Sequence, residues 1–388
     1  MTGAAQARNV VILPLADVDH GNINRMSRAM AEGFAVAGLE TTFMDYRDGA
    51  PPPAQGLGEQ VESGRVLAVM AMNAVGFPTT GHDILVQHGT RLFVYGMDHP
   101  CHLFPLLEIL PAGTMVSFPT ASNVDCVHRW GLGHLRFLHV AHAAQPADPL
   151  PWTERDIPML LVGNLSRAAA DFAEVWQTRG EETPVLEAMA EIHAAGGLHT
   201  LEAVCRRALT ETGNAEGPLA EPRAFAKILR YFDPYARALA RESILKALAG
   251  LPVTVVGDWS GMKGAPPPAV TFTGPLEAET VRDMARRSKC VIDTMPPHIR
   301  SHERVFDAMA NAATAATLGA TDYPELDAGG AIVAAPDPAA LADALRSLAA
   351  DDGAMRQRAE AGHAALKDGH TWTNRAWVIK NALLALAG

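Results

Sequence analysis

The stretch CVIDTMPPHIRSHERVFDAMANAA, residues 290–313, joins a short apolar run to an amphipathic helix through a loop with two prolines. A run such as CVID is typical of a parallel strand that is buried on both faces. In such sheets, ligands bind beyond the carboxyl ends of the strands, where the following helix begins. The stretch therefore predicts an α/β fold with a ligand site at the start of this helix.

Other parts of the chain repeat the alternation of strand and helix. NVVILPL at residues 9–15 predicts a buried strand, and apolar residues at spacings of three and four from Ile23 to Ala37 predict a helix that ends at Gly38. Further short strands are expected up to about residue 145, and a second series begins with IPMLLVGNLS at residues 157–166. The segment AQPADPLPWTERD between the two series is rich in proline and charge, which indicates a linker.

The predicted architecture is two Rossmann-like, doubly wound α/β domains. We expect an N-terminal domain at residues 1–148 and a C-terminal domain at residues 149–370, with a helical insert at about 168–249. Residues 371–388 are expected to form a helix that docks back on the first domain. A cleft between two such domains is the expected ligand site.

Composition and charge exclude several classes of function. The net charge is −11 with acidic residues spread along the chain, whereas a nucleic-acid surface needs clustered Lys and Arg. The four cysteines form no CxxC and no Cys/His metal spacing, which favours free thiols in a reducing compartment. No apolar run approaches the ~18 residues of a membrane span. We therefore expect a cytoplasmic protein that has no membrane span and does not bind nucleic acid.

Cationic or hydrogen-donating side chains crowd the start of the helix that opens this section, namely His298, Arg300, His302 and Arg304. Ser301 is expected to cap the helix, and Glu303 suits its positive end, so capping explains part of the pattern. Cations oppose a helix N-terminus unless an anion is bound there, and a phosphate or pyrophosphate would satisfy them. Glu303 and Asp307 are four residues apart on one helix edge and could accept hydrogen bonds from sugar hydroxyls.

Two loops of the first domain offer a general base for an acceptor hydroxyl. Each follows an expected strand, and histidine beside aspartate suits deprotonation near neutral pH. The alternative is that both aspartates only cap helices or form turns. The candidates are Asp19 and His20 in the loop ADVDHGN, where Gly21 and Asn22 permit close backbone approach, and Asp98, His99 and His102 in the loop YGMDHPCHL.

Several ordered motifs of the C-terminal half resemble the nucleotide-sugar module of the CgeB-like glycosyltransferases. HERVFDAMANAATAATLGATDYPEL, residues 302–326, resembles the helix, strand and Pro-Glu-Leu turn of that module. A His-Thr-x-x-x-Arg element is matched by His370, Thr371 and Arg375. LPVTVVGDW and IPMLLVGNLS resemble two strands of the same module.

The resemblance implies a GT-B fold, with two facing Rossmann-like domains and a group 1-like nucleotide-sugar module in the second. It also implies a glycosyltransferase that moves a sugar from a nucleotide diphosphate donor to the hydroxyl of an acceptor glycan, protein or small molecule. No cofactor and no obligatory metal are expected, because basic side chains and a helix dipole meet the diphosphate charge. The predicted donor-site residues are Gly21, Asn22, Gly163, Asn164, Gly257, Trp259, Lys263, Arg300, Ser301, His302, Glu303, Arg304 and Asp307.

Some of these positions have other interpretations, and the reaction itself stays open. Trp259 could pack beneath its loop instead of stacking on a base, and Lys263 could simply be solvated. Ile299 stands where retaining relatives have a second acidic residue, and Asn311 where the family often has glycine. A nucleotide-sugar epimerase and a non-catalytic sugar-nucleotide-binding module are alternatives. A NAD-dependent dehydrogenase is disfavoured because no GxGxxG opens a helix after the first strand.

Overall fold

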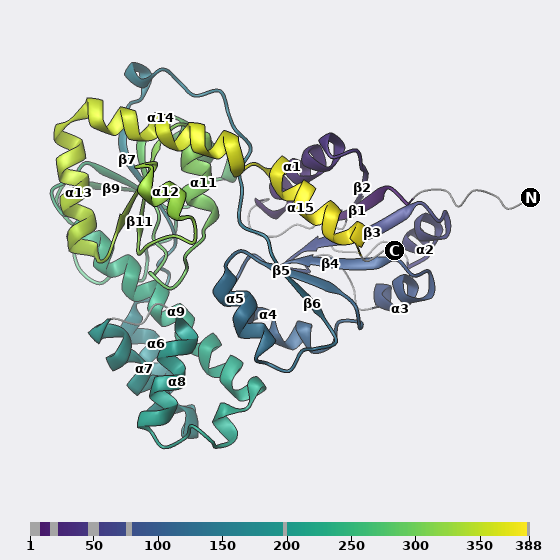
Figure 1. Cartoon of the computed structure of the whole chain (residues 1–388). Helices are drawn as coiled ribbons and strands as arrows, with labels where there is room; N and C mark the ends of the chain where they lie inside the picture. Colours follow the sequence, from purple (N-terminus) through teal and green to yellow (C-terminus); the bar gives the residue numbers. More distant parts are fainter. Residues whose placement is uncertain (1–7, 16–21, 46–53, 75–79, 197–199, 386–388) are drawn as a thin grey trace, which may run out of the picture. The chain divides into compact units, whose positions relative to one another are not determined.

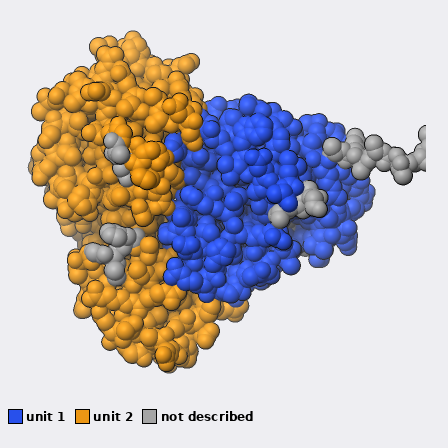
Figure 2. Space-filling model, in the orientation of Figure 1, with its two compact units in different colours: residues 1–145, 370–388 blue, residues 146–369 orange. Residues whose placement is uncertain are grey.

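Within the residues that the structure describes, the strands form two six-stranded parallel sheets (Figure 1). The computed structural model describes residues 8–15, 22–45, 54–74, 80–196 and 200–385. Unit 1 comprises residues 1–145 and 370–388, and unit 2 comprises residues 146–369 (Figure 2). Each unit has helices between its strands, which confirms the predicted doubly wound α/β class.

Unit 1 contains a sheet in the order β2-β1-β3-β4-β5-β6. The strands β1 and β3 at its centre are buried along their whole length, as the apolar run at residues 9–15 predicts. The strands are β1 (Val10–Leu15), β2 (Glu40–Asp45), β3 (Val66–Met72), β4 (Arg91–Tyr95), β5 (Met115–Phe118) and β6 (Arg136–His139). The helices are α1 (Asn22–Val36), α2 (Ala54–Glu62), α3 (Thr80–Gln87), α4 (Pro100–Leu107), α5 (Ala121–His128) and α15 (Trp372–Ala385).

The last helix, α15, packs on α1 and completes the core of unit 1. Trp372 is fully buried and meets Tyr95 of β4 edge to face, with 5.9 Å between the ring centroids. The His-Thr-x-x-x-Arg element fixes the start of this helix, because Arg375 Nη2 donates to the His142 carbonyl at 3.0 Å and lies 3.0 Å from His370 Nδ1. Residues from the two ends of the chain thus share one core.

Unit 2 contains a sheet in the order β12-β11-β10-β7-β8-β9. The strands are β7 (Ile157–Val162), β8 (Val253–Val256), β9 (Val270–Gly274), β10 (Ser288–Ile292), β11 (Thr314–Leu318) and β12 (Ile332–Ala335). Helices outside the insert are α10 (Ala278–Arg286), α11 (Glu303–Ala310), α12 (Pro324–Ala328), α13 (Pro338–Ala350) and α14 (Asp352–Gly369), and a short 3-10 turn, η2 (Trp152–Glu154), precedes β7. Since right-handed crossovers leave β7 and β10 in opposite directions, α9 and α13 cover one face, and α10 and α11 cover the other.

A helical insert, defined here as α6 to α9, lies between β7 and β8. It consists of α6 (Ala169–Trp176), α7 (Thr183–Ala195), α8 (Leu201–Glu211) and α9 (Pro222–Ala247), with 3-10 turns η3 (Gly180–Glu182) and η4 (Pro218–Ala220). The aromatic rings of Trp176 and Phe232 stack in its core, 5.8 Å apart. No helix within the described residues is long and apolar enough to cross a membrane.

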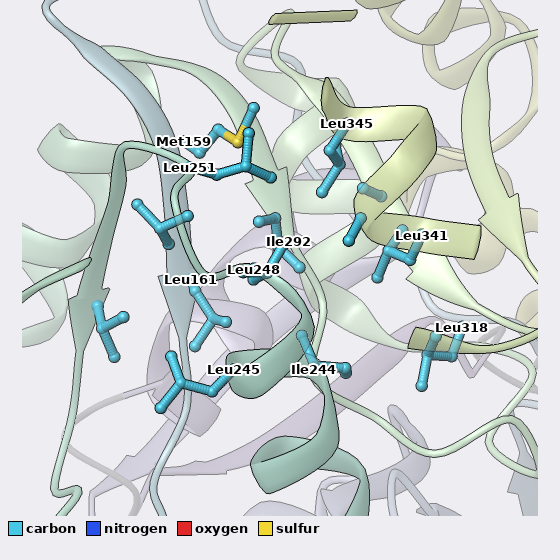
Figure 3. Packing of buried hydrophobic residues seen from close by; sticks show 14 of the residues in the cluster. Met159, Leu161, Ile244, Leu245, Leu248, Leu251, Ile292, Leu318, Leu341 and Leu345 are labelled. Atoms are coloured by element: carbon cyan, nitrogen blue, oxygen red, sulfur yellow. The ribbon is translucent and has the colours of Figure 1, made fainter. Parts of the chain in front are cut away.

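The core of unit 2 forms where α9 reaches the sheet (Figure 3). Ile244, Leu245 and Leu248 of α9 belong to one buried cluster with Leu161 of β7 and Ile292 of β10. Full burial of a Leu or Ile side chain contributes roughly 1.5–3 kcal/mol. The C-terminal turns of α9 are therefore firmly anchored, which fixes the helix turns that precede them.

A Gly33→Ala substitution is expected to destabilise unit 1. A Cβ at this position of α1 would lie 2.8 Å from the Trp372 carbonyl oxygen of α15, so two helix backbones must separate. Overpacking of this kind costs about 1–3 kcal/mol, more than the roughly 0.5–1 kcal/mol gained from helix propensity. Urea unfolding should show a lower midpoint.

Gly58→Ala in α2 is the matched control, because a Cβ there meets nothing within 4 Å. It should leave the urea midpoint unchanged or raise it. Equal midpoints for the two variants would contradict the close approach of α1 and α15.

Candidate functional site

The strand order of unit 2 reverses between β7 and β10, and the region beyond the carboxyl ends of these two strands is called the crevice here. These neighbouring strands are followed by crossovers in opposite directions, so the loops at their carboxyl ends diverge. Such a switch point is where open α/β sheets bind ligands. Gly163 and Asn164 follow β7, and Asp293 and Thr294 follow β10, so these four residues border the crevice.

Helix α9 brings an arginine to this crevice. Arg241 Nη1 donates to the Asn164 carbonyl at 2.6 Å, and its Nε lies 3.4 Å from Thr294 Oγ1. A Cβ on Gly163 would lie 2.8 Å from Thr294 Oγ1, so the loop after β7 requires glycine for this approach. The guanidinium of Arg241 therefore bridges the loops after β7 and β10.

Positive charge accumulates around Arg241. Burial, followed by the nearby positive charges of Arg304 and Arg237, lowers the pKa of Arg241 to about 10. Among the described residues, no carboxylate lies within ion-pair distance of Arg241. Arg304 Nη1 is buried without a hydrogen-bond partner in the described part of the chain, and its nearest carboxylate oxygen, Asp293 Oδ1, is 3.9 Å away. This arrangement favours an anion between the guanidinium groups.

Asp293 is a buried carboxylate at the end of β10. Burial alone would raise the pKa of its carboxyl, but His302 and Arg304 more than offset this and lower the pKa below its ordinary value. Thr317 Oγ1 donates to Asp293 Oδ2 at 3.3 Å, and His302 Nδ1 lies 3.2 Å from Oδ1. Asp293 therefore stays ionised and holds the start of α11 near the strand end.

The start of α11 differs from the sequence prediction in one respect. His302, and not Ser301, is the N-cap residue, and its Nδ1 accepts from the Arg304 amide at 3.4 Å. Ser301 is buried, and its Oγ accepts from the Tyr323 hydroxyl at 2.9 Å.

The acidic residues of α11 lie at its exposed edge. Glu303 Oε2 is 3.0 Å from His302 Nε2, so the imidazole stands between two carboxylates. Asp307 lies one turn further along α11 and is half-buried. Both positions remain candidates for contacts to sugar hydroxyls.

Two of the basic residues near α11 pair with carboxylates other than Asp293. Arg300 Nε lies 3.0 Å from Asp322 Oδ1, and its Nη2 donates to the Thr321 carbonyl at 3.1 Å, so Arg300 braces the loop after β11. His298 Nε2 lies 3.2 Å from Asp233 Oδ1 in the helical insert. Of the predicted basic cluster, only His302 and Arg304 contact Asp293 in the crevice.

The loop after β8 interlocks with the loop after β7. Gly257 has φ 124°, and a Cβ there would lie 2.1 Å from the Gly163 carbonyl oxygen. Asn164 Oδ1 accepts from the Asp258 amide at 2.9 Å. Gly163, Asn164 and Gly257 thus shape this edge of the sheet through their backbones.

Trp259 and Lys263, on the same loop, contact the protein in this structure. Trp259 is 7% exposed and packs edge to face on Phe272, with 5.9 Å between centroids. Lys263 Nζ lies 2.7 Å from Asp171 Oδ1, and its side chain is 67% exposed. Trp259 thus packs beneath its loop, and Lys263 forms an ion pair that faces solvent. Both are the alternatives to ligand binding that the sequence leaves open for these residues.

In unit 1, the loops after β3 and β4 meet at the carboxyl edge of the sheet. Asn73, in the left-handed region at φ 48°, donates from Nδ2 to Asp98 Oδ2 at 2.9 Å and accepts from the Met97 amide at 2.6 Å. His99 is the N-cap of α4, where its Nδ1 accepts from the Cys101 amide. His102 lies in α4 and is half-buried.

The other predicted loop of unit 1 is largely beyond the structural description. Asp19, His20 and Gly21 lie outside the described residues. Asn22 begins α1, and its Oδ1 accepts from Arg25 Nη2 at 2.9 Å.

Sequence reasoning missed Arg241, Asp293, Thr294 and Asn73 as site residues. Signals for two of them are present in the sequence. Asp293 directly follows a buried strand, and Arg241 belongs to a row with Asp233 and Arg237 at spacings of four on α9. Neither signal identifies a site without knowledge of the strand order.

Comparisons with known proteins agree with this fold. Residues 237–381 match the model of a family described as Glycosyl transferase-like, and no curated protein matched the sequence. A structure of T4 phage β-glucosyltransferase aligns over 96% of this chain and 98% of its own, with 9% identity and a TM-score of 0.51. Sucrose-phosphate synthase from Thermosynechococcus elongatus aligns over 98% and 99%, with 12% identity and a TM-score of 0.50.

These similarities confirm the predicted GT-B fold. The family match begins in α9, at Arg237, and extends into α15, so it includes Arg241, Asp293 and α11. The C-terminal half of the chain carries a glycosyl transferase-like domain, and the enzyme class predicted from the sequence, glycosyltransferase, agrees with both findings.

Proposed function

We propose that this protein transfers a sugar from a UDP-sugar to an acceptor hydroxyl, with the donor diphosphate bound at the arginine site. The arginine site is defined as Arg241, Arg304 and Thr294. The observation that carries the proposal is that Arg241, at the β7/β10 switch point, faces the charge of Arg304 and has no carboxylate within ion-pair distance among the described residues.

The proposed role of the arginine site in the reaction is to stabilise the leaving group. When the bond to the sugar breaks, negative charge develops on the terminal phosphate of the nucleoside diphosphate. Guanidinium groups that are already positioned interact with this charge more strongly than water does, because little reorganisation is needed. The N-terminal end of α11 adds a partial positive charge on the same side.

The sugar would lie against α11 in this proposal. Glu303 and Asp307 lie four residues apart on that helix, and their carboxylates can accept hydrogen bonds from vicinal hydroxyls. The stereochemical outcome stays open, because Ile299 occupies the position of the second acidic residue of retaining relatives.

Two further observations support a UDP-sugar donor. One structurally similar protein, T4 phage β-glucosyltransferase, was solved in complex with UDP-glucose described as its substrate. The motifs at residues 302–326 and at His370, Thr371 and Arg375 resemble the CgeB-like glycosyltransferases, and we propose that this chain is related to them.

We also propose that donor binding requires no metal ion. Arg241 and Arg304 together carry two positive charges, which match the charge that a divalent cation would supply to a diphosphate. A T4 phage β-glucosyltransferase structure contains UDP and Mn²⁺, so the metal dependence of this chain needs a direct test.

The acceptor would be activated by unit 1. Asp98 is the best placed candidate base, because the Asn73 amide orients its carboxylate at the carboxyl edge of the sheet. Asp19 and His20 remain proposed alternatives. The net charge of −11 supports a glycan, a protein or a small molecule as acceptor, and not DNA.

Arg304→Ala is expected to weaken UDP binding by about 10- to 100-fold, since a hydrogen bond to a charged group contributes about 1.5–3 kcal/mol. Uridine binding should change less than about 2-fold, because uridine has no phosphate. Isothermal titration calorimetry with both ligands measures the difference. Lys263→Met is the control and should bind UDP as the wild type does, since Lys263 pairs with Asp171. Equal weakening of UDP and uridine would refute a phosphate contact.

Removal of divalent metal should leave UDP affinity within about 3-fold, since two guanidinium groups already provide the charge-assisted contacts. The measurement is calorimetry with UDP after dialysis against EDTA, and again after Mg²⁺ or Mn²⁺ is restored. A loss of binding that either metal reverses would show that the arginine site is insufficient.

Asp98→Asn is expected to lower kcat by about 10²- to 10⁴-fold, as for loss of a general base, and to leave UDP affinity unchanged. The readout is UDP release from UDP-glucose with whichever acceptor supports turnover in a screen of glycans and small molecules. Asp125→Asn, on the exposed face of α5, is the control of equal charge change. Full activity of Asp98→Asn would assign the base to another loop.

A further inference from the structure

A histidine of the loop between β10 and α11 lies against the helical insert. His298 is 8% exposed, and its Nε2 lies 3.2 Å from Asp233 Oδ1 in the middle of α9. Its ring also meets His193 of α7 edge to face, with 6.2 Å between the centroids. Two helices of the insert therefore enclose the His298 side chain.

Asp233 belongs to a row of charged residues that follows the same loop. Asp233 is 1% exposed, and its Oδ2 accepts from Arg237 Nε at 2.6 Å. Arg237 Nη1 lies 3.6 Å from Met295 Sδ, and Arg241, one turn further, lies 3.4 Å from Thr294. Three successive turns of α9 thus contact three different residues of the loop, namely Thr294, Met295 and His298.

The row has a different role at each end. At Arg241 it faces the arginine site, where positive charge is in excess. At Asp233 a buried carboxylate is compensated by Arg237 and by the imidazole of His298, as a buried charge requires. His193 adds no charge here, because burial and then the neighbouring His298 lower its pKa to about 4.

The chain between Thr294 and His298 is short and stiff. Pro296 and Pro297 fix two backbone φ angles, and the Ile299 amide closes a turn on the Pro296 carbonyl at 2.9 Å. A displacement of His298 is therefore transmitted to Thr294 on one side and to α11, with Arg304, on the other.

We propose that Asp233 and His298 are positioning residues for donor binding: the hydrogen bond between them holds the β10–α11 loop so that Thr294 and Arg304 face Arg241. This inference rests on the proposed function. It assigns the helical insert a part in binding the diphosphate, although Asp233 and His298 do not themselves touch the donor.

A role in positioning can be separated from a role in packing by the choice of substitution. In His298→Gln the side-chain amide nitrogen is placed close to the position of Nε2, so a donor to Asp233 is kept. In His298→Asn the amide is one methylene shorter and cannot reach Asp233. Glutamine also fills more volume than asparagine, so His298→Met, which is close to glutamine in size but cannot donate to Asp233, is measured as the packing control and should lose UDP affinity as His298→Asn does.

The experiment measures UDP and uridine affinity by calorimetry for the wild type, Asp233→Asn, His298→Asn, His298→Met and His298→Gln. Lys227→Met is the matched control, because it removes another ion pair of the insert on α9, that between Lys227 and Glu182. We expect UDP binding to weaken at least 10-fold in Asp233→Asn, His298→Asn and His298→Met, and less than 3-fold in His298→Gln and Lys227→Met. Uridine binding should change less than 2-fold in all variants.

A second measurement follows the loop without ligand. Hydrogen exchange of the backbone amides at residues 293–302 should be faster in His298→Asn than in His298→Gln. If Asp233→Asn does not fold, the comparison of His298→Gln with the size-matched His298→Met decides the question by itself.

The outcomes distinguish the inference from the function on which it rests. If the wild type binds UDP and His298→Asn binds it equally well, the inference is wrong and the proposed function stands. Equal losses in His298→Met and His298→Gln also overturn the inference, because packing would then explain both. If the wild type binds no nucleoside diphosphate, the proposed function fails and the inference falls with it.

Discussion

The half-buried guanidinium of Arg241, which has no carboxylate within ion-pair distance among the described residues, is the constraint on which the site depends. Removing a cation from water without an opposite charge is unfavourable. The surrounding structure compensates for it only in part, through the Asn164 carbonyl and Thr294 Oγ1. These groups carry no negative charge, and an anionic ligand would supply it. Gly163 allows the loop after β7 to approach Thr294, and Asp293 lies near Arg304, with 3.9 Å between Oδ1 and Nη1.

Helix α9 has apolar last turns and charged middle turns. Its last turns carry Ile244, Leu245 and Leu248 into the core, where burial fixes the helix on the sheet. Its middle turns carry Asp233, Arg237 and Arg241 at spacings of four, so the charges lie in one row. Burial of the apolar last turns fixes α9 on the sheet. The positions of the charged residues in its middle turns are thereby fixed as well. The same helix thereby joins the insert to the carboxyl edge of the sheet.

The two units use their sheet edges in different ways. In unit 2 the edge is cationic, and its backbones interlock through Gly163 and Gly257. In unit 1 the edge presents a carboxylate, Asp98, oriented by an asparagine in the left-handed region. One edge therefore presents positive charge, and the other presents a carboxylate.

The sequence by itself determined the fold class and the neighbourhood of the site. Buried apolar runs such as residues 9–15 and 290–293, alternating with amphipathic helices, can be satisfied only by parallel sheets covered on both faces. It also indicated α11 and Arg304, because cations at a helix N-terminus need an anion.

The sequence could not assign a partner to each charged side chain. Ser301 is the better cap in isolation, but in the structure its Oγ accepts from the Tyr323 hydroxyl and His302 occupies the cap position. Arg300, His298 and Lys263 are predicted from the sequence as cations near a phosphate, and the structure places each beside a carboxylate, namely Asp322, Asp233 and Asp171. Arg241 shows the converse, because only the strand order, which places β7 beside β10, brings a residue of the insert to the switch point. Electrostatic partners are set by distances between segments far apart in the chain, and tertiary structure alone fixes those distances.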